Sequence, residues 1–271
     1  MKLFYTLLPI FLLSIGVSAQ KLPDVQVKGI LVPSTVRIDG KNLEWDAFAA
    51  ENKRTSLLYT IANDDKNLYL AIKASDHETI TKIMAGGISF TINTKGKKRE
   101  QDAFVITYPL IVRASGNRGN MGQNRQRAGQ EQSQKERDSI TLAQRKTQLA
   151  SVKEIKALGF KQISDTLISI YNEYGIKAVA KMDEQGAYIY EAAIPLSLLE
   201  IAAGSTNEIA YQIKLNGLPN NGNFAMRANA GPAFGGGNAR AGNFGSGANT
   251  NAARQDLMTA TDFWGKYVLQ K

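Results

Sequence analysis

Short apolar segments with alternating polarity, each bounded by turn-forming residues, run along most of this chain and constrain its fold more than any other feature. Residues 57–62 and 68–74 are two such segments, and the residues between them have the composition of a hairpin loop. Others lie at residues 88–92, 103–112, 166–171, 176–182, 188–194, 209–215 and 263–269. Period-two alternation is typical of half-buried strands. With little helix between them, these segments predict an all-β chain folded as a two-sheet antiparallel β-sandwich.

The first 19 residues have the pattern of a secretory signal peptide. Lys2 precedes an apolar run over residues 3–17, and Val17-Ser18-Ala19 fits a cleavage site. A membrane anchor is the alternative, but the run is shorter than the roughly 20 residues that a spanning helix needs. We expect cleavage, export to the periplasm, cell surface or extracellular space, and a single domain over residues 20–271 with no transmembrane segment. The chain has no cysteine, which excludes a disulfide framework.

Two segments depart from the strand pattern and read as flexible insertions, at about residues 114–157 and 216–256. Both are rich in Gly and Asn. The net charge is +9, and residues 113–156 hold ten basic residues against four acidic ones, so the basicity belongs to an insertion. Within it, residues 134–156 predict one covering helix with an apolar side, ended by Gly159. That side consists of Leu142, Leu149, Val152 and Ile155.

Three phrases in the sequence resemble family 9 carbohydrate-binding modules. They are Ile38-Asp39-Gly40 leading to Trp45, Asn67-Leu68-Tyr69-Leu70 followed by Asp76, and Tyr190-Glu191-Ala192-Ala193-Ile194-Pro195. The resemblance spans residues 36–199, with a looser match at 263–267. It is strongest to exported proteins of Bacteroidetes-type bacteria within the wider DOMON-like group. It implies a jelly-roll-like sandwich that holds a sugar between two aromatic side chains, with structural calcium in some members and haem b in other relatives.

A sugar ring stacks well on a flat aromatic surface and forms hydrogen bonds with planar polar partners. The candidate carbohydrate-binding residues are therefore Trp45, Trp264, Tyr190 and Glu191. Each has a structural alternative: both tryptophans can be core residues, and Glu191 can be held by a partner such as Arg37. On the strand at 188–194, alternation predicts that Tyr188 and Tyr190 share one face and that Glu191 lies on the other.

Metal and haem ligands are scarce. For calcium, the hard-oxygen candidates are Asp39, Asp64, Asp65, Asp76 and Glu78. Asp64 and Asp65 are the metal residues that we single out, although two adjacent acids in a hairpin loop also fit an ordinary turn. The sequence requires no cofactor and is compatible with bound Ca²⁺. Haem would need an axial ligand such as His77, the one histidine, or Met84.

The sequence favours a non-catalytic, exported carbohydrate-binding protein. There is no cysteine nucleophile and no strand–helix phosphate loop, so we single out no catalytic residue. If the protein acts in catalysis, glycoside hydrolysis or polysaccharide breakdown by a carboxylate pair is the expected chemistry. The alternatives are an envelope structural or interaction protein, whose basic insertions contact another protein or an anionic surface, and a haem-binding DOMON-like domain. We expect no nucleic-acid partner.

Overall fold

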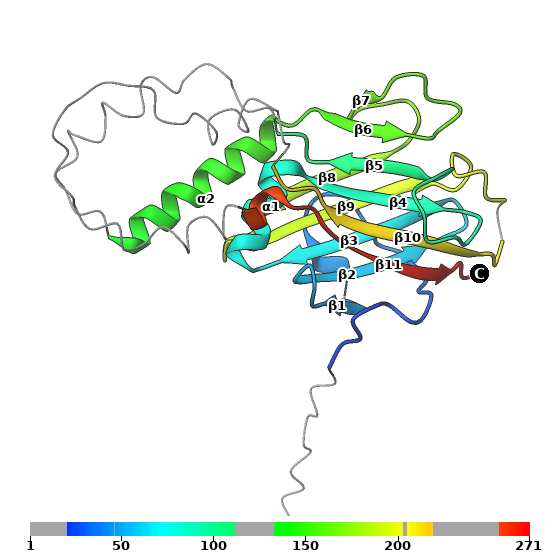
Figure 1. The fold of residues 1–271 in the computed structure, drawn as a ribbon, viewed down its shortest axis with the longest axis horizontal. Helices are drawn as coiled ribbons and strands as arrows, with labels where there is room; N and C mark the ends of the chain where they lie inside the picture. The colour runs from blue at the N-terminus through cyan, green and yellow to red at the C-terminus, as the bar shows by residue number, and fades with distance from the viewer. Residues whose placement is uncertain (1–20, 46, 112–132, 203–204, 219–254) are drawn as a thin grey trace, which may run out of the picture.

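Two antiparallel sheets packed face to face form the body of the protein. The structure is a computed structural model that describes residues 21–45, 47–111, 133–202, 205–218 and 255–271. One sheet has five strands in the order β1–β2–β3–β9–β8, and the other has six in the order β11–β10–β4–β5–β6–β7 (Figure 1). The predicted two-sheet antiparallel sandwich is therefore confirmed.

The strands agree closely with the alternating segments of the sequence. The five-stranded sheet contains β1 (Ala50–Asn52), β2 (Leu57–Asn63), β3 (Asn67–Ala74), β8 (Lys177–Met182) and β9 (Tyr188–Pro195). The six-stranded sheet contains β4 (Ile88–Asn93), β5 (Phe104–Tyr108), β6 (Glu154–Leu158), β7 (Leu167–Ser169), β10 (Glu208–Leu215) and β11 (Thr261–Val268).

Alternation along these strands sends every second side chain into a single large core between the sheets. Tyr59 and Tyr211 meet there from opposite sheets, with 2.8 Å between their hydroxyl oxygens. On β9 the side chains of Tyr188, Tyr190, Ala192 and Ile194 point inward. The predicted division of β9 into two faces is confirmed, because Glu191 contacts the segment outside the sheet instead.

A second, smaller apolar cluster lies on the outer face of the five-stranded sheet. The N-terminal strap, which we define as residues 30–45 and 47–48, crosses that face. Trp45 packs there against Tyr69 and Ala193, with Val36 and Ile38 beside it. Residues 36–38, whose alternating Val-Arg-Ile sequence suits a strand, do not form one. That part of the strap has no ladder partner, and the strap touches the sheet's backbone through one parallel bridge, Leu31 to Asn63.

Two α-helices and one short 3₁₀ helix, η1 (Asn42–Glu44), accompany the sheets. Helix α1 (His77–Gly86) was not predicted; Asp76 caps it, its Oδ2 accepting from Thr79 N at 2.8 Å. Helix α2 (Gln134–Ser151) begins with a capping box between Ser133 and Glu136.

Helix α2 is shorter than the predicted span of 134–156. Val152 leaves the helical conformation, and residues 154–158 pair with β5 and β7 as strand β6. Gly159, expected to end the helix, instead follows β6 at φ +86°. Only the C-terminal part of α2 leans on the sandwich, because Leu149 is its one buried residue (Figure 1).

Several predicted segments fall outside the described residues. These are the signal peptide at 1–19 and, within the two insertions, residues 114–132 and 219–254. The described parts of the insertions are α2, the start of β6 and the ends of the second segment. None of the helices among the described residues has the length and apolar character needed to span a bilayer.

Candidate functional site

Two of the three motifs behind the family resemblance, residues 38–45 and 190–195, meet at one buried carboxylate. Glu191 is 0 % exposed. Its Oε2 accepts from the backbone N–H groups of Asp39 at 3.0 Å and Gly40 at 2.8 Å, and its Oε1 accepts from Trp45 Nε1 at 3.0 Å. We call these four residues the strap joint. The expected arginine partner, Arg37, is exposed, and the backbone amides of the neighbouring turn take its place.

The strap joint is a closed structural contact. Burial raises the pKa of Glu191, and the hydrogen bonds from Gly40, Trp45 and Asp39 oppose that rise by favouring the charged form. Trp45 is only 6 % exposed, and its one polar atom is engaged. In this conformation neither Trp45 nor Glu191 presents a free surface to a sugar, so their predicted role in binding stays a prediction.

Tyr190 lies on the opposite face of β9, inside the sandwich core. It is fully buried, as is Tyr188. Among the described residues neither hydroxyl has a hydrogen-bond partner. Two unpaired buried hydroxyls on one strand are unusual, because buried polar groups are nearly always hydrogen-bonded.

The metal candidates form a turn. Asp64 Oδ1 accepts from the backbone N–H groups of Lys66 at 2.8 Å and Asn67 at 2.6 Å, and its Oδ2 accepts from the Tyr69 hydroxyl at 2.8 Å. Burial, and to a lesser extent the Asp64 carboxylate, raises the pKa of Tyr69 to about 12. Asp65 is exposed. Within the described ranges no group of three or more His, Cys, Asp or Glu side chains is arranged to hold a metal ion.

Trp264 is the one partly exposed member of the predicted sugar site. It lies on the outer face of the six-stranded sheet, paired with Gln212 of β10, which in turn pairs with Thr91 of β4. Gln212 Nε2 donates to Asp262 Oδ2 at 2.6 Å, which fixes the amide beside the indole. An aromatic ring next to a planar amide and a carboxylate has the chemistry of a sugar-stacking surface.

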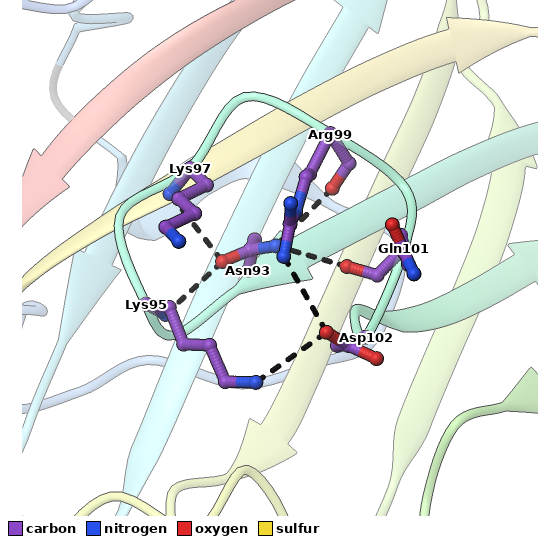
Figure 2. Close-up of polar contacts among 6 residues, drawn as sticks. All are labelled: Asn93, Lys95, Lys97, Arg99, Gln101 and Asp102. Atoms are coloured by element: carbon purple, nitrogen blue, oxygen red, sulfur yellow. Dashed lines mark hydrogen bonds and ion pairs between the residues drawn. The ribbon is translucent and has the colours of Figure 1, made fainter.

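The β4–β5 loop, residues 94–103, is built around Asn93 on the same outer face. Asn93 Nδ2 donates to the carbonyls of Arg99 and Gln101, and its Oδ1 accepts from the amides of Lys95 and Lys97 (Figure 2). Asp102 Oδ2 lies 3.4 Å from Lys95 Nζ and 3.5 Å from Arg99 Nη2. From this loop, Glu100 reaches Lys214 of β10 at 2.6 Å. The loop is thus held over the sheet near Trp264.

A polar pocket of about 440 Å³ lies at one end of the sandwich. It is bounded by the β1–β2 turn, the first turns of α1, and the chain that enters β11. Its lining residues are Arg54, Thr55, Ser56, Asp76, His77, Glu78, Thr79, Thr81, Lys82, Leu215, Asp256, Leu257 and Thr261. No aromatic side chain other than the His77 imidazole is among them.

Charges of both signs face this polar pocket. Lys82 is 8 % exposed, its ammonium donates to Thr261 Oγ1, and burial lowers its pKa while nearby Asp256 raises it. Among the described residues, the side chains of Arg54 and Glu78 form no hydrogen bond or ion pair, and the Asp256 carboxylate interacts with Lys82 only through its charge. The pocket therefore combines donors and acceptors that have no hydrogen-bond partner in the described part of the chain.

The two haem candidates, His77 and Met84, are both on α1 but have different solvent exposure. His77 is exposed, with Nε2 3.4 Å from Arg145 Nη2, whereas Met84 is buried in the main core. Arg145 also donates to Thr81 Oγ1 at 2.9 Å, and burial lowers its pKa. Haem binding stays a prediction, which a Soret band in the purified protein would test.

Residues of the polar pocket other than Asp76, His77 and Glu78 were not singled out from the sequence. One signal was available: Asp76 at an N-cap, followed by Ile80, Ile83 and Met84 at helical spacing, marks α1. Arg54 and Asp256 come from turns far apart in the chain, and no local pattern links them.

No model of a known protein family matches the chain, and no curated protein matches it at a significant level.

Proposed function

We propose that this protein is a non-catalytic carbohydrate-binding protein that holds a sugar in the polar pocket beside α1. The observation that carries the proposal is the free hydrogen-bonding capacity of the lining: the side chains of Arg54, Glu78 and Asp256 face the same pocket and form no hydrogen bond in the described structure, although Asp256 is attracted by Lys82. The resemblance to family 9 carbohydrate-binding modules favours a sugar among the polar ligands that such a pocket could take.

A sugar hydroxyl both donates and accepts a hydrogen bond, so its site needs acceptors and donors side by side. Glu78 and Asp256 supply carboxylate acceptors, and Arg54 supplies a planar set of donors. The hydroxyls of Thr55 and Ser56 can do either. At about 440 Å³ the pocket is within the size range of small-molecule sites.

The decisive experiment is isothermal titration calorimetry of the protein against neutral mono- and oligosaccharides. The double variant Arg54→Met with Glu78→Gln keeps side-chain size while removing one donor set and one charged acceptor. We expect it to weaken binding at least tenfold. The matched control, Lys97→Met with Glu173→Gln, changes one exposed cation and one exposed acid outside the pocket and should bind like the wild type.

Trp264 provides the internal comparison. If stacking on the six-stranded sheet is the main contact, Trp264→Ala will weaken binding and the Arg54/Glu78 variant will not. If the pocket is the site, the opposite holds. No heat change with any sugar of the panel would refute both versions of the proposal.

One observation favours a second candidate, an envelope interaction protein. The end of β5, the end of β10 and the start of β11 lie together, because Ile88 pairs with both Tyr108 and Leu215, and Leu215 pairs with Thr261. The basic, Gly/Asn-rich segments therefore join the sandwich at the same end as the polar pocket. A flat sugar titration combined with saturable binding to anionic vesicles would favour this function.

A further inference from the structure

A second pocket, of about 390 Å³, lies at the edge of the sandwich beneath α2. We call it the α2 pocket. One wall is the edge strand β8, another is the C-terminal part of α2 and the residues after it, and Tyr108 of β5 closes the interior side. Its lining residues are Tyr108, Lys146, Leu149, Ala150, Val152, Lys153, Ile170, Ala178, Val179, Ala180, Lys181 and Met182. None of them lines the polar pocket beside α1.

The chemistry of this lining is one-sided. Its uncharged members are apolar apart from the Tyr108 hydroxyl, three lysines accompany them, and no acidic residue is among them. Lys146 forms an exposed ion pair with Glu184 at 2.8 Å, a contact that contributes little in water. Lys153 is exposed and has no ion-pair partner among the described residues. Lysines around an apolar hollow are complementary to an anion attached to an apolar body.

The unpaired phenols of β9 do not line the α2 pocket themselves, but they lie next to residues that do. The Tyr108 ring stacks on Tyr190 with centroids 6.2 Å apart and planes inclined by 25°. In the β8–β9 register, Tyr190 lies opposite Ala180 and Tyr188 opposite Met182, and both partners line the pocket. Burial raises the pKa of Tyr188 and of Tyr190, so both stay protonated with an O–H group to donate.

We propose that the α2 pocket binds an amphipathic carboxylate. Its apolar body would lie between α2 and β8 against Tyr108, and its carboxylate would lie at the Lys146 and Lys153 end. Tyr108 closes the inner end of the site, and the buried side chains of Tyr188 and Tyr190 lie behind the residues that line it. The ligand's body is aliphatic or aromatic, and the experiment separates these two.

The experiment is calorimetric titration of the whole protein with sodium decanoate, sodium 2-naphthoate and decyltrimethylammonium chloride. We expect saturable binding of one or both carboxylates and none of the ammonium. Decanoate alone would identify an aliphatic ligand, and naphthoate alone an aromatic one. Equal binding of the ammonium, or no binding of either carboxylate, would overturn the proposal.

Two variants locate the site. Ala180→Phe fills the pocket from β8, and Lys153→Glu reverses a charge at its exposed rim; each should weaken carboxylate binding at least fivefold. Lys97→Glu, an equal charge change on the β4–β5 loop, should leave it unchanged. Wild-type affinity in Lys153→Glu would refute the assignment even if Ala180→Phe fails to fold, because an exposed lysine tolerates replacement. Since the two pockets share no residue, a failed sugar titration would leave this result unaffected.

Discussion

Two consecutive residues of β9, Tyr190 and Glu191, show how differently the two faces of one sheet treat a buried polar group. Both are 0 % exposed. On the outer face, Glu191 accepts three hydrogen bonds from the strap. On the inner face, the hydroxyls of Tyr190 and Tyr188 have no partner among the described residues.

The difference separates a satisfied structural contact from two phenols whose hydroxyls are left without a hydrogen bond. A satisfied buried network fixes conformation, whereas an unpaired buried hydroxyl costs about 1–3 kcal/mol and packs no better than phenylalanine would. The outer face therefore satisfies its buried polar group, and the inner face leaves two hydroxyls unsatisfied among the described residues. This contrast can be broken at either face.

The largest effect should come from Glu191→Ala. It removes the acceptor of two backbone amides and one indole N–H, all of which stay buried under the strap. We expect the free energy of unfolding to fall by about 3 kcal/mol or more, measured by urea denaturation. Glu191→Gln keeps the side-chain size and one acceptor and should lose less. A change below about 1 kcal/mol in Glu191→Ala would mean that the strap is not held by this contact.

Gly40→Ala tests the turn that presents the amides. Gly40 has φ +77°, and an added Cβ would lie 2.9 Å from Lys181 Cγ. Gly186 is the matched control, because its φ is +84° and a Cβ there would meet nothing within 4 Å. We expect Gly186→Ala to cost about 1 kcal/mol from backbone strain and Gly40→Ala about 2 kcal/mol. Equal losses in the two variants would show that Lys181 moves aside freely.

The inner face should respond in the opposite sense to hydroxyl removal. Tyr190→Phe and Tyr188→Phe delete unpaired hydroxyls and should change stability by less than about 1 kcal/mol, or raise it. Tyr59→Phe is the comparison, since that hydroxyl accepts from Gln26 N at 2.9 Å and contacts Tyr211 Oη at 2.8 Å. It should cost about 1–2 kcal/mol. A comparable loss in Tyr190→Phe would reveal a partner for that phenol.

The smallest effect concerns pH. Because burial raises the pKa of Glu191 in the folded state, its protonated form is favoured by folding. Its contribution to stability is therefore fully present below the unfolded pKa of about 4.3 and is lost as pH rises through the folded value. The stability difference between wild type and Glu191→Gln should accordingly shrink as pH rises from about 4 toward neutrality. Trp45 fluorescence should follow the same titration; a pH-independent difference would contradict it.

Much of the fold could be predicted because strands leave a period-two signature. The assignment of Tyr190 to one face of β9 and Glu191 to the other followed from alternation alone. Helix α1 was not predicted because its polar first turn, beginning at His77, resembles a solvated loop, although Asp76 is a good N-cap. The start of β6 was assigned to a helix because Glu154 and Lys156 suit a helix as well as a strand, and only pairing with β5 decides between them.

The sites were less accessible to sequence reasoning. Two of the three donors to Glu191 are backbone amides, which carry no residue signature, and they lie 151 and 152 positions away. The same holds for the two pockets, whose walls come from separate strands, turns and helices. The motif residues Asp39, Gly40, Trp45 and Glu191 therefore report how the strap is attached and are a weak guide to the ligand.

The long separation within the strap joint also sets an order of events during synthesis. The strap emerges early, yet the carboxylate that anchors it is made about 150 residues later, which at 5–20 residues per second is a delay of roughly 8 to 30 s. Until then Ile30, Val32, Val36 and Ile38 can pack only on β2 and β3, without the β9 part of the face that they cover. The apolar side chains of the strap consequently stay partly exposed on the nascent chain until β9 is made. A segment with exposed apolar side chains is suited to binding by a holdase chaperone.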